Sequence, residues 1–435
     1  MTTTEETGVL VLGGGFAGLA TARELERRAP PRFEITLVNR ENYLLFTPML
    51  PEVASGSLEM RAIAQPLRRS LRRTRFVLGE ATNVDLGART ATVEHPVLGR
   101  SSTLRFEHLV LALGAETSTL GIPGVAEHTF PLKTLPDAAR LRTQVGSVFE
   151  AAAASSDRVE RDRLMRFVIV GGGFTGTEAA GELDGYVRRL RRFYPALGDV
   201  APEVVVIHDE HRLLDELPPV FGKRAAASLR RRNVRLELGE KVASVDATGL
   251  ALGSGRRFDS ATVVWTAGVE PAPLIKKLGL QTSKHGALVV NGDFSVPGAP
   301  GVWGAGDCAR VPKPEGGEYA PLAQNAVREG PLLARNIVSA LAGKPTTAFA
   351  YRRMGTMASL GNRDAVAQLP GNRMVAGLPA WLMWRAYYLG RLPGLPQKMR
   401  VAADWTLGGM FAQSVARLPW TSPGQTAQDD HAAEG

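Results

Sequence analysis

The sequence has a single cysteine, Cys308, in 435 residues. A disulfide or a dithiol relay needs two sulfur atoms within bonding reach, so neither can form within this chain. Thiol redox chemistry is therefore not expected. Long apolar runs are also missing, since no stretch reaches the roughly 18 uncharged apolar residues that a membrane-spanning helix needs. We expect a chain that does not cross a bilayer.

The N-terminus lacks the features of a secretory leader. It reads MTTTEET and continues directly into an apolar strand, without a basic segment, an apolar segment and a small-residue cleavage site in series. We expect a cytoplasmic start. With 44% hydrophobic and 22% charged residues the composition is globular, and the length suffices for more than one domain. The net charge of +9 favours an anionic partner, which could be nucleotide phosphates, nucleic acid or an acidic lipid surface.

A glycine-rich turn lies near the N-terminus between an expected strand at 7–12 and an expected helix at 19–28. The turn contains Gly13, Gly15 and Gly18. In a dinucleotide-binding unit the first glycine allows the tight bend, the second lets a pyrophosphate approach the backbone, and the third lets helix and strand pack closely. The phosphate then lies at the N-terminus of the helix. An isolated motif of this kind also occurs in ordinary turns.

The same pattern recurs in the middle of the chain. A strand at 165–170 leads to Gly171, Gly173 and Gly176, and a helix is expected at 177–190. Each unit continues into a second strand, at 33–38 and at 204–207. Two complete strand, turn and helix contexts predict an α/β chain with two Rossmann-like dinucleotide-binding domains.

The residue at the end of the second strand normally binds the ribose hydroxyls through a carboxylate. Asn39 stands there in the first unit, and His208 followed by Asp209 in the second. An amide can still donate and accept hydrogen bonds, whereas His208 leaves the ribose contact to its own imidazole or to Asp209. Arg212 is close enough in sequence to serve a 2′-phosphate. The cofactor of the second unit is therefore NADH or NADPH.

On these motifs the chain resembles the two-dinucleotide-binding flavoproteins and, within them, the type II NADH dehydrogenases. The resemblance covers about residues 9–420 and is carried by the two glycine turns together with 41–51 (ENYLLFTPMLP), 263–269 (VVWTAGV), 301–307 (GVWGAGD) and 323–330 (AQNAVREG). It implies a single-subunit, non-proton-pumping NADH:quinone oxidoreductase. Hydride would pass from NADH to FAD in the first unit, and two electrons would then reduce a membrane quinone.

The resemblance also implies which residues form the sites. The residues implied to contact FAD are Gly13, Gly15, Gly18, Asn39, Arg40, Thr47, Gly114, Asp307 and Gln324. Those implied to contact the nicotinamide cofactor are Gly171, Gly173, Gly176, Glu178, His208, Asp209, Ala267 and Gly268. Asp307 also has a case of its own, because a carboxylate at the end of an apolar strand suits a ribityl hydroxyl.

Glu178 and Gln324 are the implied catalytic residues. Glu178 is expected in the first turn of a helix, where the helix dipole alone accounts for a carboxylate. The resemblance instead places it between nicotinamide and flavin as a proton source. Without the resemblance, Gln324 and Glu329 are interpreted as surface residues of a helix that begins after Pro321. The family has a glutamine pair near Arg328 and Glu329, so the sequence departs from the family at the quinone site.

The end of the chain is rich in aromatic and basic residues. Four of the six tryptophans are Trp381, Trp384, Trp405 and Trp420, and the interspersed basic residues are Arg385, Arg391, Lys398, Arg400 and Arg417. Trp381, Trp384 and Tyr388 recur on one helical face, which suits a lipid interface. Packing on the body or a dimer contact is the alternative. Gly390 and Pro393 predict two short helices instead of one long helix.

We therefore expect an FAD-binding domain formed by 1–115 and 285–345, with a nicotinamide domain inserted at 116–284. A membrane-association region at 346–420 and a disordered tail at 421–435 follow. The expected cofactors are FAD and NADH, with NADPH left open, and no metal site is recognised. The expected partners are a membrane quinone and an anionic lipid surface at the cytoplasmic face of the cell membrane, with a homodimer as an option.

Several other functions share part of this sequence pattern, and specific residues distinguish them. A sulfide:quinone oxidoreductase needs redox cysteines that the chain lacks. A soluble reductase of another acceptor has no use for the Trp-rich basic end, and a flavin-bound redox sensor would turn over slowly. Nucleic-acid binding is not expected, because the basic runs at 68–75 and 188–192 fit solvated helix faces without interleaved aromatic residues.

Overall fold

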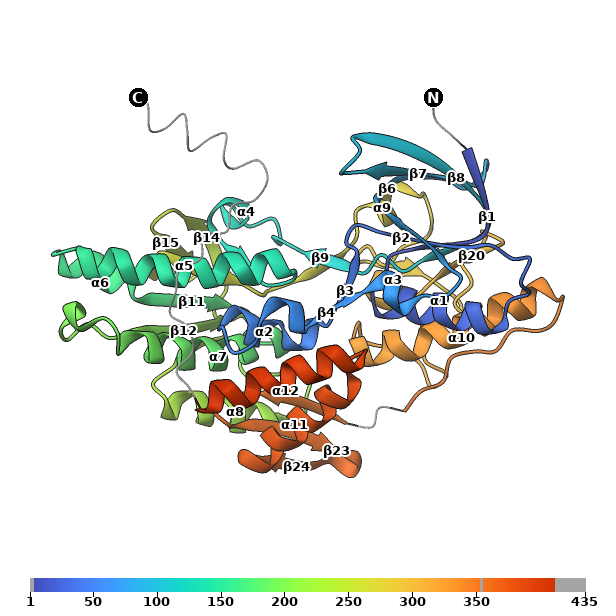
Figure 1. Ribbon diagram of the computed structural model, residues 1–435. Helices are drawn as coiled ribbons and strands as arrows, with labels where there is room; N and C mark the ends of the chain where they lie inside the picture. The colour runs from blue at the N-terminus through green and yellow to red at the C-terminus, as the bar shows by residue number, and fades with distance from the viewer. Residues whose placement is uncertain (1–3, 353–354, 411–435) are drawn as a thin grey trace. The chain divides into compact units, whose positions relative to one another are not determined.

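The chain passes several times between two structural units, of which the computed structural model describes residues 4–352 and 355–410. The first unit consists of Met1–Leu45, Ala64–Glu116 and Val269–Arg353. The second consists of Phe46–Ile63, Thr117–Gly268 and Met354–Gly435. Figure 1 labels their elements. The first unit contains a mixed sheet and the second a parallel one, and each unit is described by itself.

The central strands of the first unit's sheet are apolar and buried, whereas the two antiparallel strands at one edge are partly exposed. Its strands are β1 (Thr4–Leu12), β2 (Ile35–Asn39), β5 (Arg75–Leu78), β6 (Glu80–Asp85), β7 (Thr90–His95), β8 (Arg100–Leu111) and β20 (Val302–Gly304). Their order is β5-β2-β1-β8-β7-β6, with β20 beside β8. Val9 pairs in parallel with Ile35 on one side and with His108 on the other. Residues 9–12 are completely buried, as expected for a central parallel strand.

Two helices of the first unit, α1 (Phe16–Arg28) and α10 (Ala323–Leu341), pack against each other. Gly330 permits this contact, since a Cβ there would lie 2.5 Å from the Ala17 carbonyl oxygen. The 3₁₀ helix η4 (Gly306–Cys308) follows β20 and packs against α10. The other short elements are β3 (Tyr43–Leu45), β4 (Ala64–Pro66), α3 (Leu67–Ser70), β9 (Ala115–Thr117), β18 (Val269–Pro271), α9 (Leu274–Lys277), β19 (Leu288–Val289) and β21 (Ala309–Arg310).

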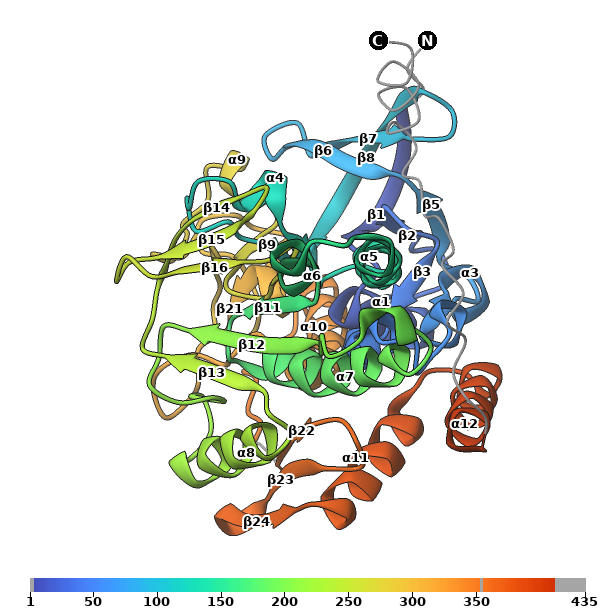
Figure 2. The ribbon, with the colours of Figure 1, turned by 90° about the vertical axis from the view of Figure 1, so that its left-hand side faces the viewer.

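The second unit has a five-stranded parallel sheet. Its strands, in spatial order, are β10 (Phe130–Pro131), β17 (Thr262–Trp265), β11 (Arg166–Val170), β12 (Glu203–His208) and β13 (Arg235–Leu238). Helices α5 (Leu135–Ala154) and α7 (Phe174–Arg191) cover opposite faces of this sheet (Figures 1 and 2). A capping box of Thr134 and Asp137 starts α5. The remaining elements are η1 (Thr47–Met49), α2 (Leu50–Ala54), η2 (Met60–Ala62), α4 (Val125–His128), α6 (Arg158–Leu164), η3 (Pro195–Leu197), α8 (Pro219–Arg231), β14 (Val242–Asp246), β15 (Gly249–Leu252) and β16 (Arg257–Asp259).

The C-terminal segment belongs to the second unit. It forms a three-stranded antiparallel sheet, η5 and two helices: β22 (Thr356–Ser359), β23 (Ala365–Leu369), η5 (Pro370–Asn372), β24 (Arg373–Ala376), α11 (Leu378–Arg391) and α12 (Leu395–Met410). Asp364 accepts a hydrogen bond from Ser228 of α8. A Cβ on Gly181 of α7 would lie 2.1 Å from the Leu360 carbonyl oxygen, so the segment packs tightly on α7.

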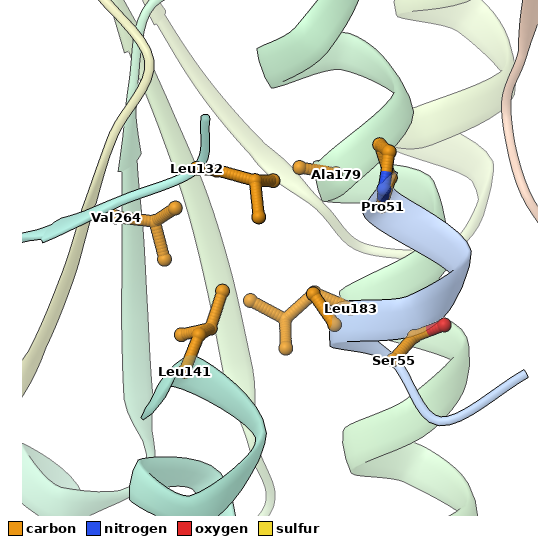
Figure 3. A pocket seen from close by; sticks show the side chains of 8 residues that line it. Pro51, Ser55, Leu132, Leu141, Ala179, Leu183 and Val264 are labelled. Atoms are coloured by element: carbon orange, nitrogen blue, oxygen red, sulfur yellow. The ribbon is translucent and has the colours of Figure 1, made fainter. Parts of the chain in front are cut away.

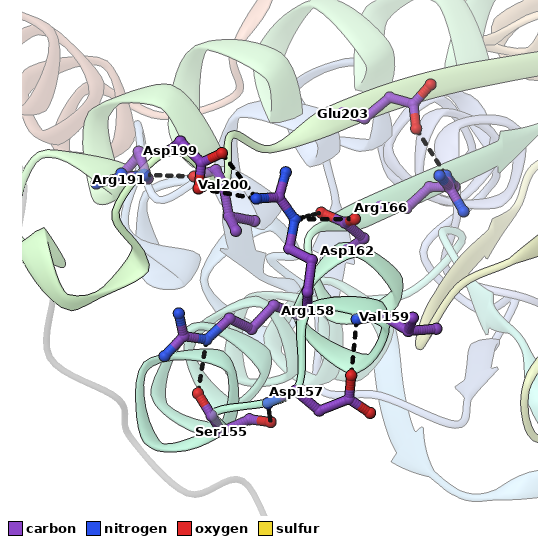
Figure 4. A network of polar contacts seen from close by, with 11 residues as sticks. Ser155, Asp157, Arg158, Val159, Asp162, Arg166, Arg191, Asp199, Val200 and Glu203 are labelled. Carbon is purple, nitrogen blue, oxygen red and sulfur yellow. Dashed lines mark hydrogen bonds and ion pairs between the residues drawn. The ribbon is translucent and has the colours of Figure 1, made fainter.

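An exposed network of charged side chains fastens α6 to the segment before β12 (Figure 4). Arg158 places Nε 3.1 Å from the Asp162 carboxylate and Nη1 2.7 Å from that of Asp199. Arg191 donates to the Val200 carbonyl at 2.8 Å. Because these groups are exposed, the network orders a surface loop and contributes little to stability.

The structure differs from the expected organisation in its boundaries. Residues 46–63 group with the second unit, because α2 packs on α5 and α7, and residues 269–284 group with the first. By their contacts, residues 355–410 group with the second unit, since their sheet packs on α7 and α8. The two helices begin earlier than expected, at Phe16 and Phe174, directly after the second glycine of each turn. Two short C-terminal helices are present, as expected from Gly390 and Pro393.

The basic run at 68–75 is not a solvated helix face. Helix α3 ends at Ser70, and the Arg73 side chain donates to backbone carbonyls. These belong to Leu25, Glu26, Ala29 and Phe33. Arg73 therefore satisfies orphan carbonyls at the end of α1, which is a structural role.

Candidate functional site

The two glycine turns have the same backbone geometry. Gly13 has φ of +105° and Gly171 of +108°, a region that L side chains rarely adopt. The third glycines, Gly18 and Gly176, are equally constrained, since a Cβ would lie 1.8 Å and 1.9 Å from the carbonyl oxygens of Gly13 and Gly171. Both turns therefore require glycine at these positions for backbone reasons.

The second glycine of each turn is different. Its backbone conformation is an ordinary one, and its distinguishing feature is the open space around it. Gly15 and Gly173 are the N-caps of α1 and α7, with φ of −71° and −69°. No atom of the described residues lies within 4 Å of a Cβ built at either position. Neither residue has a side chain to cap its helix. A phosphate can therefore approach the backbone and the positive helix end at both turns, which fits a dinucleotide in each unit.

At the end of β2, Asn39 supports the first turn. Its Oδ1 accepts from the Gly14 N–H at 2.8 Å, and its Nδ2 donates to the Glu41 carbonyl at 2.8 Å. Next to it, the Arg40 guanidinium lies 2.7 Å from the Glu116 carboxylate. Asn39, Arg40 and Gly13 line a cavity of about 230 Å³, together with Glu80, Glu116 and Lys277. The structure thus brings three of the expected FAD contacts to one cavity.

At the end of β12, His208 occupies the equivalent place in the second unit. A Cβ on Gly172 would lie 2.5 Å from its Cδ2, so the imidazole packs against the middle of the turn as Asn39 does against Gly14. Its Nδ1 is 3.3 Å from the Asp209 carboxylate and its Nε2 is 3.6 Å from that of Asp215. The Arg212 side chain donates to the Asp215 carbonyl at 2.6 Å. Carboxylates therefore dominate the surroundings of this strand end.

Asp307 lies in η4, directly after β20, and is partly exposed. The adjacent Gly306 N–H donates to the Glu329 carboxylate at 2.8 Å. Glu329 is buried, contrary to its expected surface position, because α10 turns this face towards η4. Burial raises the pKa of Glu329 to about 7, and the negative charge of Asp307 adds to the effect. The apolar and small residues of α10 on the same face, Ala326 and Gly330, are the sequence signal for this burial.

The other expected FAD residues are spread over several loops. Gln324 lies in the first turn of α10 and is partly exposed, and its carbonyl accepts from Arg328 at 2.6 Å. Gly114 has φ of +71° in the segment after β8. Thr47 begins η1 in the second unit. Cys308 is buried, and burial raises the pKa of its thiol to about 12, so the thiol stays protonated at neutral pH.

Ala267 and Gly268 follow the end of β17 in the second unit. The preceding Thr266 hydroxyl donates to the Val170 carbonyl at 2.8 Å, which fixes this segment beside the second glycine turn. Gly268 has φ of +79°. The expected nicotinamide contacts at 171–178, 208–209 and 267–268 therefore gather at one edge of the sheet, where the parallel strands β11, β12 and β17 end.

Glu178 lies in the second turn of α7 and is buried. Its Oε1 accepts hydrogen bonds from the Ser359 N–H at 2.9 Å and from the Trp384 indole at 3.3 Å. Burial raises its pKa to about 8, and the negative charge of Glu182 contributes in the same direction. A helix-dipole role alone does not account for a buried carboxyl with partners from β22 and α11.

Two further carboxyl groups lie near Glu178, the buried Glu52 and the half-buried Glu182, and no local sequence pattern indicates either of them. Glu182 lies one turn later on α7, with its Oε2 3.4 Å from the Ser55 hydroxyl. Glu52 of α2 accepts from the Trp405 indole at 3.2 Å. Helix α2 also borders an apolar cavity of only about 10 Å³, lined by residues such as Pro51, Leu132 and Leu183 (Figure 3). Within the described chain, no group of His, Cys, Asp and Glu has the arrangement of a metal site.

The expected aromatic membrane face of α11 is wrong in one respect. Trp384 is only 1% exposed and points into the protein, because its indole donates to Glu178. The Arg385 guanidinium lies over the rings of Trp381 and Trp405, at 3.9 Å and 4.4 Å from their centroids. The exposed apolar side chains of the two helices are instead Leu378, Leu382, Met383, Leu395, Met399, Leu407 and Met410. Trp420 and Arg417 lie outside the described residues, as does the expected tail at 421–435. Over the described ranges, helices fall short of the length and apolarity needed to cross a bilayer.

Comparison with known proteins agrees with this geometry. Residues 7–330 match the family model described as pyridine nucleotide-disulphide oxidoreductase, and residues 354–414 match that of the NDH2 C-terminal domain. The type II NADH:quinone oxidoreductase Ndh of Mycobacterium tuberculosis is 33% identical over 414 residues, covering 92% of this chain and 87% of that protein. The type II NADH:quinone oxidoreductase of Staphylococcus aureus is 28% identical over 382 residues, covering 86% of this chain and 92% of that protein.

A solved structure has the same fold. NDH2 from Plasmodium falciparum in complex with NADH matches with a TM-score of 0.86 at 18% identity, covering 94% of this chain and 99% of that chain. The disulphide in the family description has no counterpart here, because the chain has one cysteine. With both dinucleotide units, the C-terminal domain and these relatives in agreement, the chain belongs to the type II NADH:quinone oxidoreductase family, within the pyridine nucleotide-disulphide oxidoreductases.

Proposed function

We propose that this protein oxidises NADH and reduces a quinone, with FAD as the carrier between them. The observation that carries the proposal is the pair of glycine turns with matching geometry, one in each unit, in a chain of this family. Two such turns serve two dinucleotides. FAD, when bound, accepts a hydride from NADH and passes two electrons on to the quinone.

The first unit is assigned to FAD. Its turn at Gly15 admits the pyrophosphate, the cavity beside Arg40 receives the adenosine part, and Asp307 holds the ribityl and phosphate region. Support comes from the cavity of about 230 Å³ next to the turn and from the position of Asp307 at a strand end. Glu329 holds the backbone N–H of Gly306, so it orients the turn that carries Asp307.

The second unit is assigned to NADH in preference to NADPH. Asp209 and Asp215 flank the His208 imidazole at the ribose position, and their negative charge opposes a 2′-phosphate. Arg212, the candidate cation for such a phosphate, instead donates a hydrogen bond to a backbone carbonyl. Gly173 admits the pyrophosphate, while Ala267 and Gly268 border the nicotinamide end.

Glu178 is assigned as a proton source. Oxidation of NADH with two-electron reduction of a quinone to a hydroquinone takes up one proton beyond the transferred hydride. A carboxyl with a pKa of about 8 still carries its proton at neutral pH, as a donor requires. Gln324, on the first turn of α10, is assigned to quinone binding on the strength of the family resemblance.

The C-terminal helices are assigned to a lipid surface at the cytoplasmic face of the cell membrane. Exposed Leu378, Leu382 and Met383 on α11 and Met399 on α12 provide apolar contact, and Arg391 and Arg400 are exposed among them. Such a mixture of apolar and basic side chains binds the interface of an anionic bilayer.

The test of the function is a steady-state assay of the purified, FAD-loaded chain. NADH oxidation should be slow without an acceptor and rapid with a quinone analogue, and NADPH should be a much poorer donor. Anaerobic addition of NADH should bleach the flavin, and addition of quinone should restore it. Bleaching without quinone-dependent recovery would favour a redox sensor or a reductase of another acceptor. An NADPH rate equal to that of NADH would contradict the assignment of the ribose site.

A further inference from the structure

Helix α7 presents two carboxyl groups one turn apart, the buried Glu178 and the half-buried Glu182, and the proposed chemistry uses only the first. Glu178 and Glu182 stand at positions i and i+4, so their side chains lie on the same helix face. Ser359 contacts both: its N–H donates to Glu178 at 2.9 Å, and its hydroxyl lies 3.5 Å from the Glu182 Oε1. A change of charge on one carboxyl therefore changes the pKa of the other.

Glu182 is the member of the cluster whose negative charge is best supported. Burial raises its pKa, but the guanidinium groups of Arg189, Arg385 and Arg232 all act against that rise. The hydroxyls of Ser55 and Ser57 lie at 3.4 Å and 3.5 Å from its Oε2. Glu182 is therefore the carboxyl most readily ionised in this cluster.

Glu52 and Glu178 have less compensation. Burial raises the pKa of Glu52 well above its ordinary value, and the negative charge of Glu182 adds to the rise. The pKa of Glu178 is raised to about 8 by burial, with Glu182 again adding to the effect. Glu182 is therefore the carboxyl of this cluster whose negative charge has the most compensation, while burial favours the protonated forms of Glu52 and Glu178.

We propose that Glu182 is a positioning residue whose negative charge adds to burial in keeping the Glu178 carboxyl in its protonated, proton-donating form. The proposal rests on the role of Glu178 as a proton source. Ionisation of Glu178 would place a buried anion one helical turn from Glu182, where like charges repel more strongly than they do in water. After Glu178 has given up its proton, the same repulsion drives it to take up another.

Arg385 is the counter-ion whose positive charge offsets the negative charge of Glu182. Its guanidinium is held between the rings of Trp381 and Trp405, so the positive charge cannot swing away into solvent. The charged and titratable groups that face Glu178 and Glu182 come from α2, α7, the end of α8, and α11: they are Glu52, Tyr186, Arg189, Arg232, Arg385 and Tyr388. The C-terminal helices thus supply the charge balance of the proton site as well as an exposed face.

The decisive variant is Glu182→Gln in the FAD-loaded, full-length protein. It keeps the shape and removes the charge. Its alkaline limit for quinone reduction at saturating NADH should move to lower pH by roughly one unit. Flavin reduction by NADH without quinone, which takes up no further proton, should keep its rate at neutral pH. Glu182→Asp retains the charge and should restore the pH profile towards that of the unaltered protein.

Glu52→Gln is the matched control. It removes a buried carboxyl whose ionised form burial disfavours, so it should leave the alkaline limit in place. An alkaline limit that is identical in Glu182→Gln and the unaltered protein would overturn the proposal. So would an equal shift in Glu52→Gln, because the effect would then report disturbed packing.

A spectroscopic measurement keeps the proposal testable without turnover. The infrared band of the protonated Glu178 carboxyl can be assigned by its loss in Glu178→Gln and titrated in the oxidised, FAD-loaded protein. The midpoint should lie above pH 7 and fall in Glu182→Gln. Should Glu182→Gln fail to retain FAD, an ionised Glu178 at pH 7 in the unaltered protein would refute the proposal. If the protein reduced no quinone, the proposed function would fail while this titration still decided the role of Glu182.

Discussion

Replacing Gly173 with alanine should weaken the binding of NADH and leave the binding of FAD unchanged. The residue is the N-cap of α7 with φ of −69°, which alanine adopts without strain, and no described atom lies within 4 Å of the added Cβ. Gly→Ala reduces the freedom of the unfolded chain, which favours folding by about 0.4–1 kcal/mol, and this gain offsets the preference for glycine over alanine at an N-cap. We expect Gly173→Ala to fold about as well as the unaltered protein.

The loss should fall on NADH binding. A phosphate oxygen that accepts a backbone hydrogen bond lies about 2.9 Å from the nitrogen, and an added methyl group keeps other atoms about 3.5–4.0 Å away. The pyrophosphate must therefore shift and lose about one charge-assisted hydrogen bond, which costs about 1.5–3 kcal/mol. At 1.4 kcal/mol for each factor of ten, the Kd for NADH should rise about 10- to 100-fold.

The assay compares Gly173→Ala with its counterpart Gly15→Ala. Bound flavin is measured from the visible absorbance of the purified protein, and NADH affinity from the concentration dependence of anaerobic flavin reduction. Gly173→Ala should keep full flavin and weaken NADH, whereas Gly15→Ala should lower flavin content. Gly176→Ala is the contrasting control, because its Cβ would lie 1.9 Å from the Gly171 carbonyl oxygen and should destabilise the fold.

Loss of flavin from Gly173→Ala with unchanged NADH affinity would show that the two cofactors are assigned to the wrong units. Unfolding of Gly173→Ala would refute the structural argument itself, since the position would then be closed rather than open.

Three further predictions concern single features of the structure. Asp307→Ala should lose most of the bound FAD, and full flavin absorbance in that variant would remove Asp307 from the site. Because burial raises the pKa of Glu329 from 4.5 to about 7, the folded protein binds more protons than the unfolded chain between these values, so the free energy of unfolding should fall as pH rises through this range. Glu329→Gln should remove that slope, of order 3 kcal/mol in all, in denaturant titrations at several pH values; curves parallel to those of the unaltered protein would contradict the burial argument. Leu382→Ser with Met383→Ser, at exposures of 54% and 36%, should release the folded protein from anionic vesicles about 10- to 100-fold in sedimentation, and unchanged binding would leave α11 as a protein contact.

Local sequence determined the two dinucleotide folds. Strand, glycine turn and helix lie within about 25 residues of one another in each unit, so their spacing carries the geometry directly. Gly13 and Gly171 show this clearly, because their positive φ follows from the tight bend that the motif requires. The two short C-terminal helices were predictable for the same reason, since Gly390 and Pro393 act on their own neighbourhood.

Burial and partners were decided by contacts that no local pattern reveals. Trp384 looked like part of a lipid-facing stripe, yet its indole reaches Glu178, which lies 206 positions earlier in the chain. Glu329 looked solvated until its helix was placed against Gly306.

The cluster of charged groups around Glu178 depends on tertiary structure in the same way. Glu52, Glu182 and Arg385 come from α2, α7 and α11, and each alone has the sequence context of an ordinary surface charge. Helical periodicity and glycine spacing describe one segment at a time. The ionisation of a carboxyl instead depends on the solvent and the charges around it, and distant segments supply both only when the chain has folded.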